Sequence, residues 1–104
     1  MTIENELAEL RKTVQHMKDR QDILDVIYRE ARGRDRHDAE VTASAYWPDG
    51  MDEHGPVPFS LADYPELANQ GHAAGFAGNA HNITNHACEI DGDTAVCESY
   101  VIGG

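Results

Sequence analysis

The sequence has few positive charges. Eight Lys and Arg residues stand against 19 Asp and Glu residues, which gives a net charge of -11 over 104 residues. An excess of negative charge on this scale repels the phosphate backbone of nucleic acids and the headgroups of anionic lipids. We therefore expect neither nucleic acid nor a membrane surface as a partner.

Long apolar runs are also missing. No stretch reaches the roughly 20 apolar residues that cross a bilayer. The acidic N-terminus, Met1 to Glu6, lacks the basic and apolar segments of a secretory signal. No repeat, low-complexity segment or linker divides the chain, and a chain this short has apolar material for one core only. We expect a soluble, cytoplasmic protein with a single core.

Cysteine is scarce, with only Cys88 and Cys97 in the chain. They flank Asp91-Gly92-Asp93 on two predicted strands. The two cysteines lie directly opposite each other if Gly92-Asp93 forms the turn, and out of register if the turn is centred on Asp91-Gly92. No Cys-x-x-Cys or His-Glu-x-x-His spacing is present, which argues against zinc or redox chemistry. In a reducing cytoplasm we expect two small, buried thiols.

The N-terminal third is predicted to be helical. A coiled-coil-like stripe of apolar residues recurs at alternating spacings of four and three, and Asp19 or Asp22 can cap a second helix after a kink. Gly33 is expected to end that helix. Two heptads are too few for a stable free coiled coil, so the stripe should pack on its own domain or on a dimer partner. The stripe consists of Ile3, Leu7, Leu10, Val14 and Met17.

The remaining elements are shorter. Asp35 or Asp38 can cap a helix from Ala39 to Tyr46. Residues 51–59, which contain one glycine and two prolines, predict at most a short edge strand or an irregular loop. The spacing of apolar residues over 61–76 favours a third helix, and the segments 82–90 and 94–102 form the clearest hairpin.

Two residues are candidates for proton transfer. Asp35 follows a predicted helix and His81 opens a predicted strand, so the two could meet in one pocket, although a helix cap and a helix-to-strand junction explain them equally well. His81 and His86 are five apart on one strand and should point to opposite faces, which argues against a shared metal ion. His54 lies in the irregular loop, where binding residues often occur.

The order of several short motifs resembles the SnoaL-like branch of the nuclear transport factor 2 superfamily. The resemblance spans roughly Asp19 to Tyr100, and residues 1–18 resemble the helical extension that some members carry, which divides the chain into an extension (1–18) and a SnoaL-like domain (19–104). The motifs are Tyr28 with Asp35-Arg36-His37-Asp38, Tyr46-Trp47-Pro48-Asp49-Gly50, His81-Asn82-Ile83-Thr84-Asn85, and Glu89-Ile90-Asp91-Gly92-Asp93-Thr94-Ala95.

The resemblance implies an α+β cone, in which N-terminal helices pack on a curved, mostly antiparallel sheet around an apolar pocket. Relatives include hexachlorocyclohexane dehydrochlorinase, scytalone dehydratase, ketosteroid isomerase and polyketide cyclases, many of which use no cofactor or metal. By similarity His81 would be the general base and Asp35 the residue that orients it. Members normally continue with further strands, so we expect either a longer chain or a partner subunit that completes the sheet after Gly104.

The resemblance implies a cofactor-independent lyase or isomerase that acts on a small, apolar, cyclic molecule, as a homo-oligomer. The alternatives are a non-catalytic ligand-binding or dimerisation domain, and an accessory subunit similar to the small subunit of ring-hydroxylating dioxygenases. Two candidate substrate-binding residues, Tyr28 and Trp47, have an alternative reading as core aromatics, and Asn85 shares the face of His81 only if no bulge intervenes. The candidate substrate-binding residues are Tyr28, Tyr46, Trp47, His54 and Asn85.

Overall fold

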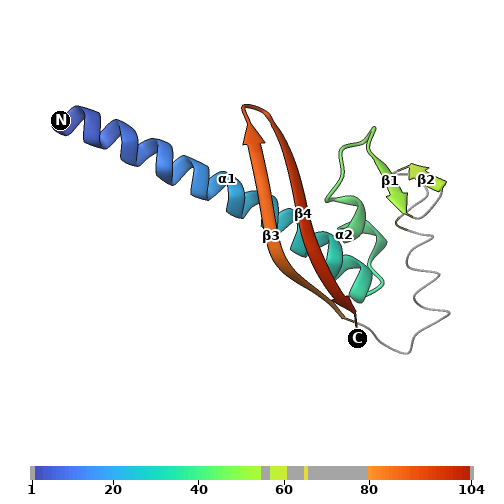
Figure 1. Ribbon diagram of the computed structural model, residues 1–104. Coiled ribbons are helices and arrows are strands. Elements are labelled where there is room, and N and C mark those ends of the chain that lie inside the picture. The colour runs from blue at the N-terminus through green and yellow to red at the C-terminus, as the bar shows by residue number, and fades with distance from the viewer. Residues whose placement is uncertain (1, 55–56, 61–64, 66–79, 104) are drawn as a thin grey trace.

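The computed structural model describes residues 2–54, 57–60, 65 and 80–103. The fold is α+β, as predicted, with a long N-terminal helix that packs against a small antiparallel sheet (Figure 1). The elements are α1 (Ile3–Asp35), α2 (Ala39–Ala43), a hairpin of β1 (Met51–His54) and β2 (Val57–Ser60), and a longer hairpin of β3 (His81–Asp91) and β4 (Thr94–Gly103).

Helix α1 runs through 33 residues without interruption, so the prediction of a kink and a second helix was wrong. The two aspartates expected to cap that second helix bond to the preceding turn instead. Asp19 accepts a hydrogen bond from the Gln15 amide (2.7 Å), and Asp22 pairs with the Lys18 ammonium group (2.7 Å). Pairs spaced by four residues stabilise a continuous helix, and here they replace the predicted cap.

Helices α1 and α2 pack closely because a glycine lies between them. Gly33 does not end α1, which continues to Asp35; it is buried against Thr42, where an added Cβ would lie 2.5 Å from Oγ1 and 2.6 Å from the backbone nitrogen. The Thr42 side chain is fully buried and its hydroxyl donates to the carbonyl of Asp38 (3.0 Å). Asp38 also caps α2 by accepting from the Val41 N–H (3.1 Å), as one of the two predicted caps.

Strands β1 and β2 form an antiparallel pair, where the sequence predicted no more than one short strand. Met51 lies opposite Ser60 and His54 opposite Val57. Pro58 is part of β2, and a two-stranded sheet tolerates it because each strand has an outer edge where no N–H is required. The helix predicted over residues 61–76 lies outside the described residues, apart from Pro65, which is helical.

The hairpin of β3 and β4 confirms the clearest prediction from the sequence. Asp91 pairs with Thr94, so the turn is Gly92-Asp93, and Gly92 has a positive φ of 58°. This turn places Cys88 directly opposite Cys97. Both cysteines are free thiols and are half-buried rather than buried. Burial, with a smaller contribution from the neighbouring Cys88 thiol, raises the pKa of Cys97 to about 11.

A β-bulge interrupts β3. Between Thr84 and Ala87 the chain advances three residues while β4 advances two, and Asn85 within the bulge has a positive φ of 54°. The extra residue reverses the alternation of faces, so the half-buried positions alternate from His81 before the bulge and from His86 after it. The prediction that His81 and His86 point to opposite faces was therefore wrong.

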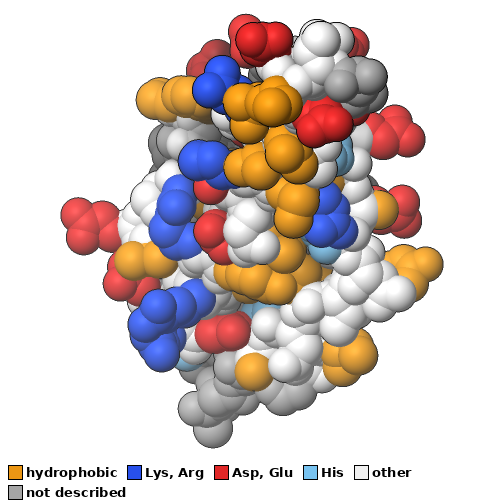
Figure 2. All heavy atoms as spheres, turned by 90° about the vertical axis from the view of Figure 1, so that its left-hand side faces the viewer, with side chains coloured by type: hydrophobic (Ala, Val, Ile, Leu, Met, Phe, Trp, Pro, Cys, Tyr) orange, Lys and Arg blue, Asp and Glu red, His pale blue; other side chains and the backbone are white. Residues whose placement is uncertain are grey.

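The N-terminal part of α1 extends away from the other elements (Figure 1), and the whole molecule measures 61 × 28 × 23 Å. All five residues of the apolar stripe are exposed, from 47% at Leu7 to 74% at Ile3. Seen from the side of the N-terminus, hydrophobic side chains lie open to solvent among charged ones (Figure 2). Among the described residues, no helix combines the length and apolar character needed to span a membrane.

Candidate active site

The structure brings Asp35 and His81 into direct contact although they are 46 residues apart. Asp35 is the last residue of α1 and His81 the first of β3. Both carboxylate oxygens accept the backbone N–H of His81, each at 3.0 Å, and Oδ1 also contacts the ring nitrogen Nδ1. The carboxylate therefore fixes the start of the strand and the histidine ring together.

The pair is largely shielded from solvent, with 14% of the His81 side chain and 21% of the Asp35 side chain exposed. Charge interactions are stronger in such surroundings than in bulk water. An ionised carboxylate can only accept hydrogen bonds, so Nδ1 of the neutral ring carries the proton in this contact. The other ring nitrogen, Nε2, is then the atom of His81 that can accept a proton.

Helix α1 holds Asp35 in an unfavourable electrostatic position. Negative charge at the C-terminus of a helix is opposed by the helix dipole. Arg32 and Arg34 in the same last turn offset this effect, and so do the donors of His81. The chain then turns sharply, because Asp38 N–H donates to the carbonyl of Gly33 (2.7 Å). The contacts of Asp35 with His81 thus offset a position that is unfavourable for the helix itself.

A second polar cluster lies around Tyr46. Its hydroxyl donates to Asp52 (2.7 Å) and lies 3.3 Å from Oε1 of Glu30, which forms an ion pair with Arg34 (2.8 Å). The cluster joins α1 to β1. Sequence reasoning missed it, although the spacing of four between Glu30 and Arg34 was a usable signal; nothing in the sequence pointed to Asp52.

The candidate substrate-binding residues lie in different places. Tyr46 belongs to the polar cluster, while Tyr28 is 45% exposed and Trp47 is 81% exposed, so neither is a core aromatic. Asn85 is exposed in the bulge and does not share the face of His81. His54 ends β1, and its side chain lies outside the described part of the chain.

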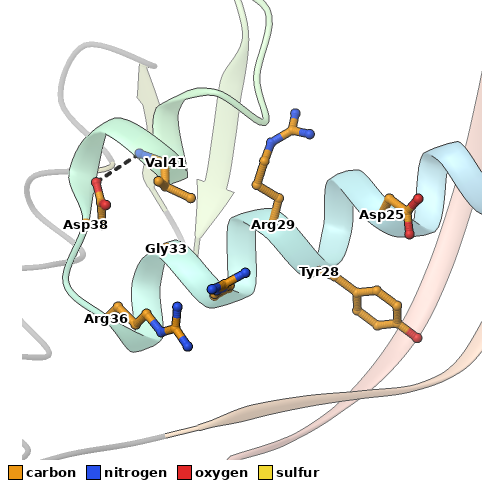
Figure 3. A pocket seen from close by; sticks show the side chains of 8 residues that line it. Asp25, Tyr28, Arg29, Gly33, Arg36, Asp38 and Val41 are labelled. Atoms are coloured by element: carbon orange, nitrogen blue, oxygen red, sulfur yellow. Dashed lines mark hydrogen bonds between the residues drawn. The ribbon is translucent and has the colours of Figure 1, made fainter.

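The main described cavity is separate from that pair. It has a volume of about 560 Å³ and lies between α1 and α2 (Figure 3), and neither Asp35 nor His81 lines it. Within it the Arg29 guanidinium already donates to the hydroxyl and the carbonyl of Ser44, each at 3.0 Å. The polar groups of the Asp35–His81 pair, in contrast, are shielded and in direct contact. The lining residues are Asp25, Tyr28, Arg29, Arg32, Gly33, Arg36, Asp38 and Val41.

Comparison with known proteins identifies a matching family and similar solved structures. The model of the SnoaL-like domain matches residues 15–103. A solved structure from Novosphingobium aromaticivorans, described as a candidate aromatic ring hydroxylase, is 28% identical with a TM-score of 0.74. The alignment covers 84% of this chain and 64% of that one, so this chain spans less than two thirds of its relative's length. No curated protein matches significantly. On the evidence of its fold and of the domain match, the chain belongs to the SnoaL-like family of the nuclear transport factor 2-like superfamily.

Proposed function

We propose that the protein is a cofactor-independent lyase or isomerase in which His81 is the general base and Asp35 orients it. The observation that carries the proposal is the shielded contact of the Asp35 carboxylate with both the ring and the backbone of His81. This contact supports one ring tautomer and one ring orientation. Both are required for a base that must meet a substrate proton in a defined position.

In the proposed reaction, Nε2 of His81 removes a proton from a carbon next to a carbonyl or a leaving group. The carbon–hydrogen electron pair moves into a new double bond, and the Asp35 carboxylate stabilises the imidazolium. A lyase releases the leaving group with its electron pair, whereas an isomerase returns the proton to another carbon. General-base catalysis of this kind supplies about 10²- to 10⁴-fold in rate.

The proposed substrate is small, apolar and cyclic. The net charge of -11 disfavours a polyanionic substrate. Pockets for small molecules in proteins are mostly apolar, with a few placed polar groups. Of the candidate substrate contacts, Tyr46 is the one kept in this proposal, because its hydroxyl already belongs to a described polar network.

A panel of small cyclic ketones, alcohols and chlorinated hydrocarbons, assayed with the wild-type protein and with single variants, tests this function. His81→Gln and Asp35→Asn should each lower kcat by about 10²-fold or more, because each removes part of the base. His16→Gln, on the exposed part of α1, is the matched histidine control and should turn over normally. Turnover that survives unchanged in both site variants would rule out the mechanism.

A second candidate is an accessory subunit similar to the small subunit of ring-hydroxylating dioxygenases. Two observations favour it: the description of the solved relative as a candidate aromatic ring hydroxylase, and the exposed apolar stripe on α1. This candidate predicts no turnover on the panel for the wild-type protein and a stable oligomer that buries the stripe. A non-catalytic binding domain would instead bind panel compounds without converting them.

A further inference from the structure

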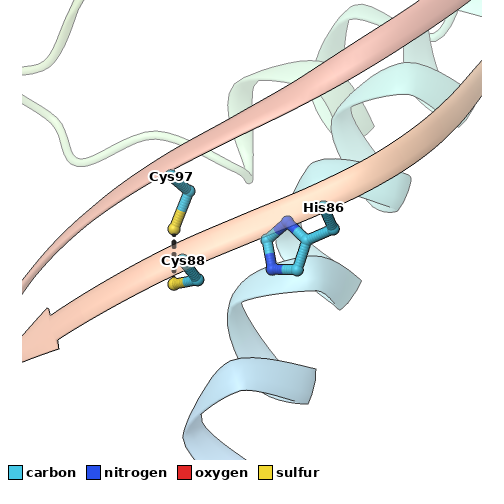
Figure 4. A group of neighbouring side chains, drawn as sticks. All are labelled: His86, Cys88 and Cys97. Atoms are coloured by element: carbon cyan, nitrogen blue, oxygen red, sulfur yellow. Dashed lines mark hydrogen bonds between the residues drawn. The ribbon is translucent and has the colours of Figure 1, made fainter.

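We propose that His86, Cys88 and Cys97 form a binding site for one zinc ion on the β3–β4 hairpin. The three side chains lie together on the hairpin near α1 (Figure 4). The site is distinct from the Asp35–His81 pair and does not depend on the function proposed above. It binds the cation through one imidazole nitrogen and two sulfurs.

The potential ligand atoms of these three residues all lie within 4.8 Å of one another. A tetrahedral zinc ion, with bonds of about 2.3 Å to sulfur and 2.0 Å to nitrogen, holds its ligand atoms roughly 3.3–3.8 Å apart. The two sulfurs are 2.6 Å apart and would separate by about 1 Å, while the ring moves slightly closer. Rotations of the side chains are sufficient for changes of this size.

Two backbone features create this group. The Gly92-Asp93 turn sets Cys88 opposite Cys97, and the bulge at Asn85 decides which face of the hairpin His86 and Cys88 share. In a regular strand without the bulge, His86 and Cys88 would still share a face, but that face would be the one opposite His81. The bulge thus turns both donors toward the half-buried face of the hairpin.

The His86 ring provides independent evidence for a ligand. Its Nε2 atom is inaccessible to solvent and has no hydrogen-bond partner, while Nδ1 lies 3.4 Å from the hydroxyl of Ser99. A buried polar atom without a partner destabilises the folded state, and a bound metal ion would remove that cost. Histidines that bind metals through one nitrogen commonly donate the N–H of the other to a neighbouring acceptor, and Ser99 fits that second position.

The donor set matches zinc better than other common cations. Thiolates and imidazole are the ligands of Zn²⁺, whereas Mg²⁺ and Ca²⁺ prefer oxygen. Two thiolates also neutralise the charge of the ion. This matters because the Arg20 guanidinium lies close by and donates to the backbone carbonyl of His86 (2.8 Å). Three protein ligands leave the fourth position of a tetrahedron for water.

Metal titration of the full chain, reduced and freed of metal, tests the proposal. Zn²⁺ is added in competition with a chromophoric chelator, and Co²⁺ serves as a spectroscopic probe. We expect one Zn²⁺ per chain, and a Co²⁺ spectrum with sulfur-to-cobalt charge transfer. His86→Gln, Cys88→Ser and Cys97→Ser should each weaken zinc binding at least about tenfold, because each removes a direct ligand.

His16→Gln is the control for loss of a histidine and should leave zinc binding unchanged. Circular dichroism of each variant verifies that the hairpin still folds, and Ser99→Ala provides a variant that keeps all three ligands and should weaken binding less. Zinc retained by all three ligand variants, or a cobalt spectrum without charge transfer, overturns the proposal. Failure of the reduced protein to bind zinc, with oxidised glutathione instead converting the two thiols to a Cys88–Cys97 disulfide by thiol–disulfide exchange, also overturns it.

Discussion

At the scale of single residues, Asp35 is one of the residues that join the long helix to the β-sheet. Its carboxylate accepts the backbone N–H of His81 and contacts the ring. The residue therefore has a structural role and a proposed catalytic role at once. Substitutions must be chosen to separate the two, because loss of activity alone would not distinguish a missing base from a displaced strand.

Asp35→Ala should lower the free energy of unfolding by about 1–3 kcal/mol, because it leaves the half-buried N–H of His81 without its acceptor. Asp35→Asn keeps one oxygen and should lose less stability, while still removing the charge that supports the imidazolium. Urea denaturation measures both variants, with Asp49→Ala at an exposed turn as the control. Equal stability of the alanine variant and the wild type would contradict the structural role.

Gly33→Ala should destabilise the protein by about 1–3 kcal/mol, because the new methyl group would overlap the Thr42 backbone at 2.6 Å. The substitution also raises helix propensity by up to about 1 kcal/mol, so the measured loss is the difference between the two effects. Gly103→Ala, where nothing lies within 4 Å of the added carbon, is the matched control. A stabilised Gly33→Ala variant would mean that α1 and α2 pack less closely.

The Cys97 thiol should react slowly in the folded protein. Burial raises its pKa from 9.0 to about 11, which lowers the thiolate fraction at pH 8 about 100-fold. Alkylation by iodoacetamide, followed by mass spectrometry in the presence of a metal chelator, should therefore be about 100-fold slower than in the urea-unfolded chain.

The raised pKa of Cys97 also makes the stability of the folded protein depend on pH. The folded state holds this proton more tightly, so the stabilising contribution is complete below pH 9 and is lost as the pH rises toward 11. Cys97→Ser should reduce this loss of stability at high pH. Equal alkylation rates in the folded and unfolded chains would contradict the shift.

At the scale of elements, the sequence predicted what local rules determine. The hairpin was predicted because alternating residues flank Asp91-Gly92-Asp93, although two positions of its turn stayed open. Asp38 was one of two predicted caps for α2. The sequence predicted a kink that α1 does not have. Asp19 and Asp22 can either cap a new helix or bond to the preceding turn, and in the structure they bond to the preceding turn. Tertiary contacts such as those of Asp52 leave no local signal.

Whether a bulge interrupts β3 was left open by the sequence, and the bulge determines which side chains share a face. Asn tolerates a positive φ better than most residues, but a single asparagine such as Asn85 is not sufficient to predict a bulge. Asn85→Val should destabilise the protein by about 1–2 kcal/mol, because a β-branched residue is strained in this conformation. Asn85→Gly should be tolerated, and thermal unfolding of the pair measures the difference. Comparable melting temperatures for the two variants would argue against the positive φ.

At the scale of the whole molecule, the exposed stripe on α1 should be covered in a homo-oligomer. In the heptad notation, its spacing puts Leu7 and Val14 at position "a" of successive heptads. Glu6 then occupies position "g" and Arg11 the following position "e", which pair as opposite charges between the helices of a parallel coiled coil. Leu10→Glu, at a d position, should shift the protein toward the monomer in sedimentation velocity. Ala8→Glu adds the same charge at an exposed b position and should not; a monomeric wild type would contradict the oligomer.

The unbroken course of α1 has a mechanical consequence. The helix contains no proline, and its only glycine is Gly33, so Ile3 and Asp35 are the two ends of one rod of about 48 Å. A shift of the helix by one residue relative to a partner that covers the stripe requires about 1.5 Å of translation along the helix axis and about 100° of rotation. That motion would carry the Asp35 carboxylate away from His81. The helix thus connects the apolar stripe near one end directly to the partner of the proposed base at the other end.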